Sequence, residues 1–193
     1  MIPLILGLLL FVGVHMVPAQ TSLRRGLAGR FGEGAYKAVF ALVAAAGLAL
    51  IVAGYHKLQL MPGKNPVLWS PPVWGRHATM LLMLPVFPLL IAAYLPGRIA
   101  GRVRHPMLTA VKLWALGHLF VRGDAASLLL FAGLLAWAVA DRISLGARER
   151  AGLVAIKSGP WRNDAIAVVV GLALYVVALK WGHAALIGYK LLP

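Results

Sequence analysis

The chain has 193 residues, of which 61% are hydrophobic and 12% charged, and its mean hydropathy is +0.85. A soluble domain of this length needs a more polar surface, so the excess apolar area is expected to face lipid. The net charge of +14 would suggest a nucleic-acid partner in a soluble protein, but here the basic residues lie in short segments between apolar runs, as in membrane loops, and we expect no nucleic acid to bind.

Six apolar segments predict an all-helical integral membrane protein. A membrane-spanning helix satisfies its own backbone hydrogen bonds and needs roughly 20 apolar residues. We expect the six helices to form a single transmembrane domain, a bundle in contact with the lipid bilayer, although the first and fourth are short. In chain order they cover residues 2–17, 36–55, 74–95, 106–121, 125–140 and 165–187.

Two of these segments carry features with structural consequences. The second has small residues at four-residue spacing, Ala41, Ala45, Ala49 and Ala53, and such a stripe lets another helix approach closely. The third contains Pro85 and Pro88, which remove intrahelical hydrogen bonds and predict a bend.

The basic residues predict the orientation of the bundle. Of the nineteen Lys and Arg residues, twelve follow the first, third and fifth segments, five lie at the opposite face and two lie within helices. The positive-inside rule then places both termini outside the cytoplasm. In a bacterial inner membrane this means the periplasm.

Histidine is the residue type that offers ligands for a cofactor. The chain has no cysteine, which excludes disulfides, iron–sulfur clusters and thiolate or covalent haem attachment. His15 and His118 lie within apolar runs, where an imidazole needs a partner and usually faces the bundle interior. The six histidines are His15, His56, His77, His105, His118 and His183.

The fourth segment concentrates further polar residues. His105 precedes Pro106 and is expected to cap the helix that Pro106 begins. Lys112 lies on the same face as His105 and needs an anion or water, such as a substrate carboxylate, a haem propionate or Asp141. Trp114, four residues before His118, shares its face and is expected to pack beside whatever His118 binds.

Several separated motifs occur along the chain. They are His15 ending the first helix, the segment 32–37, Leu68-Trp69, Arg104-His105-Pro106-Met107, the segment 112–118, and Asn163-Asp164. Together and in this order they resemble the NnrU family of bacterial membrane proteins, and the resemblance covers essentially the whole sequence.

The resemblance implies a function. The family is associated with denitrification, in particular with nitric oxide or nitrite reductase function, and is similar to the haem-dependent zeta-carotene isomerase, in which two histidines bind haem b. Carried over by motif, the ligands are His15 and His118, with His56 as an alternative. The resemblance thus implies a redox or isomerase-like role, with a hydrophobic substrate or a denitrification reductase as partner. Whether the protein is an enzyme, and on which substrate, stays open.

Depth in the membrane favours other pairs. In the predicted orientation His15 and His105 lie toward the cytoplasm, whereas His56 and His118 lie toward the outer face. Depth alone therefore favours His15 with His105, or His56 with His118. We follow the resemblance and keep His56 and His105 as reserves.

Three other functions remain open. The first is a non-catalytic accessory protein for reductase assembly. The second is an S-adenosylmethionine-dependent membrane methyltransferase, because the Arg-His-Pro segment resembles one that helps bind this cofactor. In those enzymes a glutamate pair near the end of the next helix completes the site, whereas this chain has Ala140-Asp141 there. The weakest is a zinc site of outer-face histidines, which no H-x-x-x-H spacing supports.

Overall fold

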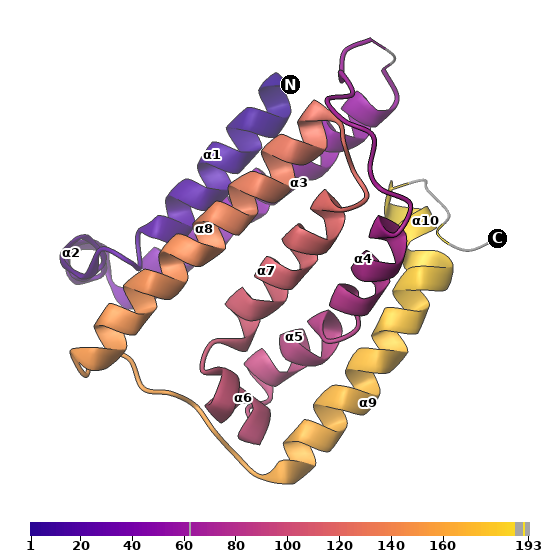
Figure 1. The fold of residues 1–193 in the computed structure, drawn as a ribbon. Helices are drawn as coiled ribbons and strands as arrows, with labels where there is room; N and C mark the ends of the chain where they lie inside the picture. Colours follow the sequence, from indigo (N-terminus) through magenta and orange to yellow (C-terminus); the bar gives the residue numbers. More distant parts are fainter. Residues whose placement is uncertain (62, 188–190, 192–193) are drawn as a thin grey trace. The chain divides into compact units, whose positions relative to one another are not determined.

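The structure is a computed structural model that describes residues 1–61, 63–187 and 191. Its regular elements are helices, with one isolated β-bridge (Figure 1). Among the described residues four helical segments are long and apolar enough to cross a membrane: Glu33–Gln59, Gly75–Tyr94, Ala125–Arg150 and Trp161–Ala185. The bent pair α1–α2 is a fifth if it counts as one span. The predicted class, an all-helical membrane bundle, is confirmed, but the described residues contain four or five candidate spans instead of the predicted six, because α7 (Pro106–Leu119) is too short to count.

The helices follow the predicted segments with some differences. The prediction missed α2 and α6, and it ended the fifth segment ten residues before α8 ends. Hydropathy marks only the apolar stretch, whereas polar residues that favour helix can continue it. The helices are α1 (Ile2–Met16), α2 (Thr21–Phe31), α3 (Glu33–Gln59), α4 (Gly75–Met83), α5 (Val86–Tyr94), α6 (Arg98–Val103), α7 (Pro106–Leu119), α8 (Ala125–Arg150), α9 (Trp161–Val177), a π-helical turn (Ala178–Gly182) and α10 (His183–Ile187).

The chain divides into two compact units. Unit 1 is Met1–Ser70 with Gly123–Trp137, and unit 2 is Pro71–Arg122 with Ala138–Pro193. Helix α8 contributes to both units, because the division falls within it. Each unit is described by itself below, and a single transmembrane domain stays a prediction.

In unit 1, glycines bring α1 and α3 into close contact. A methyl group on Gly7 would lie 2.6 Å from the backbone nitrogen of Ile51 and 2.8 Å from the carbonyl oxygen of Gly47. One on Gly54 would lie 2.5 Å from the backbone nitrogen of Leu4. Neither position has room for a side chain, so the two backbones approach as membrane helices do over small residues.

The predicted alanine stripe lies elsewhere on α3. The four alanines are all exposed, whereas Gly47, Ile51 and Gly54 are buried. The expected small-residue contact therefore exists, but the glycine face of α3 makes it. The stripe consists of Ala41, Ala45, Ala49 and Ala53.

A polar network fixes the start of α8 in unit 1. Asp124 precedes the helix, and its carboxylate accepts hydrogen bonds from the Ser127 backbone nitrogen (3.0 Å) and from Asn65 Nδ2 (2.7 Å). Ser127 Oγ lies 2.7 Å from this carboxylate and 2.8 Å from Tyr55 Oη on α3. The carboxylate thus caps the helix, and its partners connect α8 to α3 and to the preceding loop.

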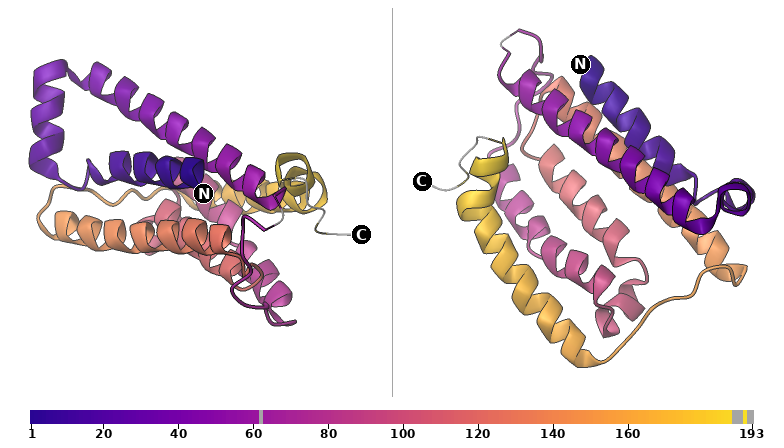
Figure 2. Two further views of the ribbon diagram at one scale, coloured as in Figure 1. Left: turned by 90° about the horizontal axis from the view of Figure 1, so that it is seen from above. Right: turned by 180° about the vertical axis from the view of Figure 1, so that it is seen from behind.

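Helix α2 turns away from α1 by 88° in unit 1 (Figure 2). It contains no buried residue and carries Arg24, Arg25 and Arg30. A short basic helix without buried residues is typical of the membrane interface.

In unit 2, α4, α5, α7 and α9 run side by side (Figures 1 and 2). The predicted proline bend is confirmed, because the third segment breaks between α4 and α5. Pro88 cannot donate to the carbonyl of Leu84, and its ring excludes that carbonyl. The Tyr175 hydroxyl of α9 donates to the carbonyl oxygen of Met80 (3.0 Å) near the break. A methyl group on Gly171 of α9 would lie 2.4 Å from the Pro88 nitrogen, so α9 packs directly on the bend.

Candidate functional site

His15 lies in an aromatic environment at the end of α1. Its ring centroid is 4.2 Å from that of Phe11, 5.1 Å from that of Phe40 and 5.2 Å from that of Trp137. Its Nδ1–H donates to the carbonyl oxygen of Phe11 (2.7 Å). Since a carbonyl can only accept, the proton is on Nδ1, and Nε2 carries the lone pair that a metal ligand needs.

Two buried donors lie beside this aromatic group. Trp137 Nε1 and the Tyr36 hydroxyl are both buried, and neither has a hydrogen-bond partner among the described residues. Tyr36 stacks against Phe40 at 6.4 Å, and the Arg24 guanidinium lies 5.5 Å from the Tyr36 ring. Buried polar groups in proteins are normally satisfied, so two unsatisfied donors beside one aromatic group are unusual.

His118 in unit 2 repeats the local geometry of His15. Its Nδ1–H donates to the carbonyl oxygen of Trp114, four residues earlier (2.8 Å), and its ring centroid is 5.1 Å from that of Trp114. The prediction that Trp114 and His118 share a face is confirmed. This bond again fixes the tautomer with its lone pair on Nε2, the arrangement of imidazoles that ligate metals.

The remaining candidate residues differ in their surroundings. His56 is exposed near the end of α3, and Lys112 is half-buried on α7. Among the described residues no carboxylate forms an ion pair with Lys112, and Asp141, one of the expected partners, bonds to Arg148 (3.2 Å). Within the described part of the chain, no group of three or more His, Asp or Glu side chains is arranged to hold a metal ion, which two-histidine ligation does not require.

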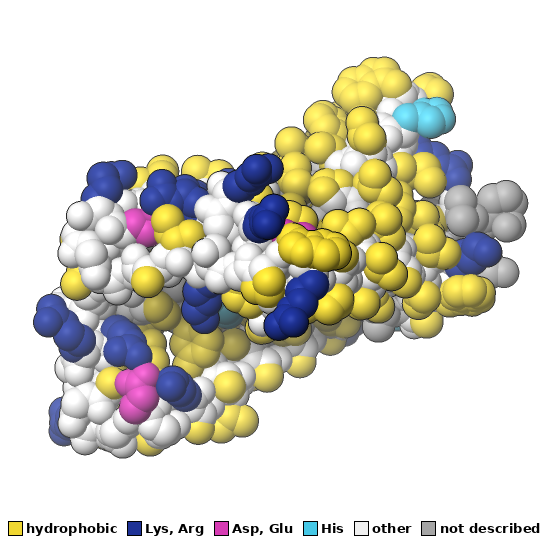
Figure 3. Space-filling view, turned by 90° about the horizontal axis from the view of Figure 1, so that it is seen from below, with side chains coloured by type: hydrophobic (Ala, Val, Ile, Leu, Met, Phe, Trp, Pro, Cys, Tyr) yellow, Lys and Arg dark blue, Asp and Glu magenta, His cyan; other side chains and the backbone are white. Residues whose placement is uncertain are grey.

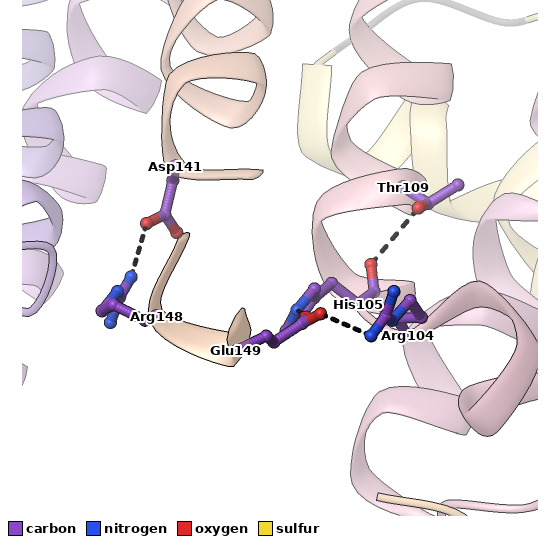
Figure 4. A network of polar contacts seen from close by, with 6 residues as sticks. All are labelled: Arg104, His105, Thr109, Asp141, Arg148 and Glu149. Atoms are coloured by element: carbon purple, nitrogen blue, oxygen red, sulfur yellow. Dashed lines mark hydrogen bonds and ion pairs between the residues drawn. The ribbon is translucent and has the colours of Figure 1, made fainter. Parts of the chain in front are cut away.

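His105 belongs to a second polar site in unit 2 (Figure 4). It occupies the predicted cap position before α7, but its side chain bonds to Glu149 at the end of α8 instead of to the helix. Arg104 Nη2 bonds to the other oxygen of the same carboxylate (2.9 Å). The Glu149 side chain is 5% exposed, so this charge is sequestered and neutralised by two neighbouring residues of the Arg-His-Pro motif.

Arg104 adopts a rare backbone conformation that creates this site. Its φ is 68°, in the left-handed region, and it is the only non-glycine residue of the described chain with positive φ. The His105 nitrogen bonds to the carbonyl oxygen of Val103 (2.9 Å), which closes a strained three-residue turn. Strain of about 1–3 kcal/mol persists where the surroundings impose it, often at functional sites. Here the turn lets consecutive side chains reach one carboxylate.

The sequence analysis missed Glu149, Trp137 and Tyr36. It compared Ala140-Asp141 with the methyltransferase glutamates, whereas the carboxylate that meets the Arg-His pair lies further along α8. Glu149 is one of only five acidic residues, and its place among arginines was the available signal. No sequence signal placed Trp137 and Tyr36 near His15, because they lie on other helices.

These features define a multi-pass helical membrane protein with two imidazoles that donate Nδ1–H to backbone carbonyls and a carboxylate held by an Arg-His pair. Residues 3–191 match the model of a protein family described as NnrU protein. The chain therefore belongs to the NnrU family, a bacterial family linked to denitrification, as its motifs predicted. No curated protein and no solved structure matches the chain. Placement in the inner membrane with both termini in the periplasm stays a prediction.

Proposed function

We propose that the protein binds haem b, which His15 and His118 would hold, and that it serves a redox role in nitrogen-oxide metabolism. The observation that carries this proposal is the shared geometry of the two imidazoles. Each donates Nδ1–H to a carbonyl four residues earlier and is held against an aromatic ring, so Nε2 is the nitrogen whose lone pair would bind iron. Such orientation of the second ring nitrogen is general among metal-ligating histidines.

The residues around His15 fit a large planar ligand with acidic groups. Phe11, Phe40 and Trp137 provide apolar contact, and Trp137 Nε1 and the Tyr36 hydroxyl are donors for a carboxylate. Arg24 lies beside Tyr36 and forms an ion pair with Glu33 (2.6 Å). Haem bound by these imidazoles would supply one-electron chemistry. The chain's own contribution is to fix both tautomers and to exclude water with aromatic rings.

The absorption spectrum of the purified protein tests the proposal. Protein from haem-replete cells, purified in detergent, is expected to show a Soret band and, after reduction, the sharp visible bands of low-spin haem b. A reduced pyridine haemochrome assay should give close to one haem per chain. Folded but colourless protein would contradict the proposal and leave the accessory role in reductase assembly, for which a co-purifying reductase is the sign.

A second candidate function is methyl transfer from S-adenosylmethionine, and the Arg104–His105–Glu149 cluster favours it. The chain resembles membrane methyltransferases in its Arg-His-Pro segment, and the structure brings a glutamate from the next helix onto that segment. An arginine suits the carboxylate of S-adenosylmethionine, and a glutamate suits its ammonium group.

Calorimetry with S-adenosylmethionine and S-adenosylhomocysteine decides this candidate. If the protein is a methyltransferase, the wild type binds either compound. Glu149→Gln then weakens binding on the order of tenfold, which is the effect of one lost charge-assisted hydrogen bond. Glu33→Gln, which removes an exposed carboxylate of α3, should leave binding unchanged. Absence of a binding heat with the wild type would remove methyl transfer.

A further inference from the structure

An open groove of about 490 Å³ lies between α6 and α9 in unit 2. One end is basic, with Arg98 and Arg102 one helical turn apart on α6. The wall along α9 is apolar and consists of Ala165, Val168 and Val169, with Trp161 at the start of that helix. The groove thus combines a cationic end with an apolar channel.

Both arginines are available to a ligand. Their side chains are exposed, and neither forms an ion pair with any residue that the structure describes. In Figure 3, which views the chain from the end where α6 and the start of α9 lie, Lys and Arg side chains gather on this end. An anion at the groove therefore meets positive charge.

The one carboxylate that lines the groove, Asp164, offsets only one of the two arginine charges and is held by the backbone of α6. Asp164 accepts hydrogen bonds from the backbone nitrogens of Arg98 (3.0 Å) and Ile99 (2.9 Å). Its neighbour Asn163 donates from Nδ2 to the carbonyl oxygen of Pro96 (2.8 Å). A methyl group on Gly97 would lie 2.1 Å from Asp164 Oδ1, so the chain passes directly over the carboxylate. Asp164 is thus used to hold α6 on α9.

We expect the groove to run from the membrane interface into the hydrocarbon layer. Helix α9 begins a candidate span of 25 residues, and only 11% of an apolar 18-residue window within it is buried, so this helix is expected to face lipid largely. Trp161 is 64% exposed at the start of this span, the depth that tryptophan prefers. Val168 lies seven residues further, roughly 10 Å deeper at the rise of a helix. The arginines therefore lie at headgroup depth and the valines at acyl-chain depth.

We propose that this groove binds an anionic phospholipid of the surrounding bilayer. Arg98 and Arg102 bind the phosphate and headgroup, since guanidinium groups match phosphate oxygens. Trp161 lies beside the glycerol region, and the upper acyl chain follows Ala165, Val168 and Val169. Charge complementarity and lipid exposure favour a lipid over a soluble anion or a protein segment, because neither of those matches both ends of the groove.

Native mass spectrometry with defined lipids tests this proposal. Purified protein is titrated with phosphatidylglycerol and with phosphatidylcholine of the same acyl chains, and bound lipid is counted. We expect the wild type to retain phosphatidylglycerol in preference to phosphatidylcholine. The double variant Arg98→Gln/Arg102→Gln should reduce this preference on the order of tenfold, since each basic residue near a headgroup contributes several-fold to binding.

A matched control separates the groove from general surface charge. Arg25→Gln/Arg30→Gln removes two exposed arginines of α2 and should keep the preference. Equal loss in both double variants would overturn the groove as a specific site. Ala165→Trp fills the apolar wall at an exposed position, keeps both arginines and should also reduce retention. Unchanged lipid binding in Ala165→Trp would overturn the proposal. If this variant keeps its lipid but loses an oligomer that the wild type forms, the groove is assigned to a second copy of the chain.

Discussion

Replacing His15 or His118 by alanine is expected to remove most of the haem from the purified protein. Each variant loses an Nε2 ligand, and haem content should fall at least about tenfold, since even the loss of a residue that only orients a metal ligand weakens metal binding by that factor. The measurement is the Soret absorbance per chain, together with the haemochrome assay. Because alanine leaves space for an imidazole, added imidazole is expected to restore part of the band, which a merely structural role would not predict.

Control variants locate the ligands. His77 is exposed at the start of α4, and His77→Ala should keep the full spectrum. His56→Ala and His105→Ala test the reserve ligands and are expected to keep it too. Persistence of the band in both His15→Ala and His118→Ala would end the assignment, and its loss in His56→Ala or His105→Ala would move the ligand to that residue.

Substituting valine for Gly7 is expected to destabilise unit 1 strongly. The added side chain would meet the backbone of α3, with its Cβ 2.6 Å from the Ile51 nitrogen, and backbone cannot rotate away as a side chain can. Overpacking of this kind costs about 1–3 kcal/mol. The cost should appear as a lower midpoint in detergent unfolding followed by circular dichroism.

Gly13 on the same helix provides the matched control. A methyl group on Gly13 meets nothing within 4 Å, and the residue is exposed. Gly13→Val should therefore leave the midpoint nearly unchanged, because valine is no worse than glycine in a helix. Equal midpoints for the two variants would show that α1 and α3 do not pack through Gly7.

Much of the local structure was predictable from the sequence. The break near Pro88 follows from the missing N–H of proline, and the start of α7 follows from His105-Pro106. Trp114 and His118 share a face because four residues make about one helical turn. The short length of α7, 14 residues or roughly 21 Å, was also apparent from its apolar run.

The candidate sites were only partly predictable. His15 and His118 could be chosen because an imidazole in an apolar run needs a partner. The tautomers of these two imidazoles could not be predicted, since they depend on the rotamer that lets Nδ1 reach a backbone carbonyl. The partnership of Glu149 with Arg104 and His105 was also hidden, because α8 continues past its apolar stretch and the contact joins residues 44 positions apart.

The sequence by itself determined that this chain is a bundle of membrane helices, where these helices lie, where one bends, and to which family the chain belongs. Only the tertiary structure decided which face of each helix is buried, as with Gly47 and Gly54 in place of the alanine stripe on α3, and which residues surround His15. The physical reason is that lipid and the bundle interior are equally apolar. Hydropathy therefore selects the residues that enter the membrane, but close packing and polar contacts select their neighbours.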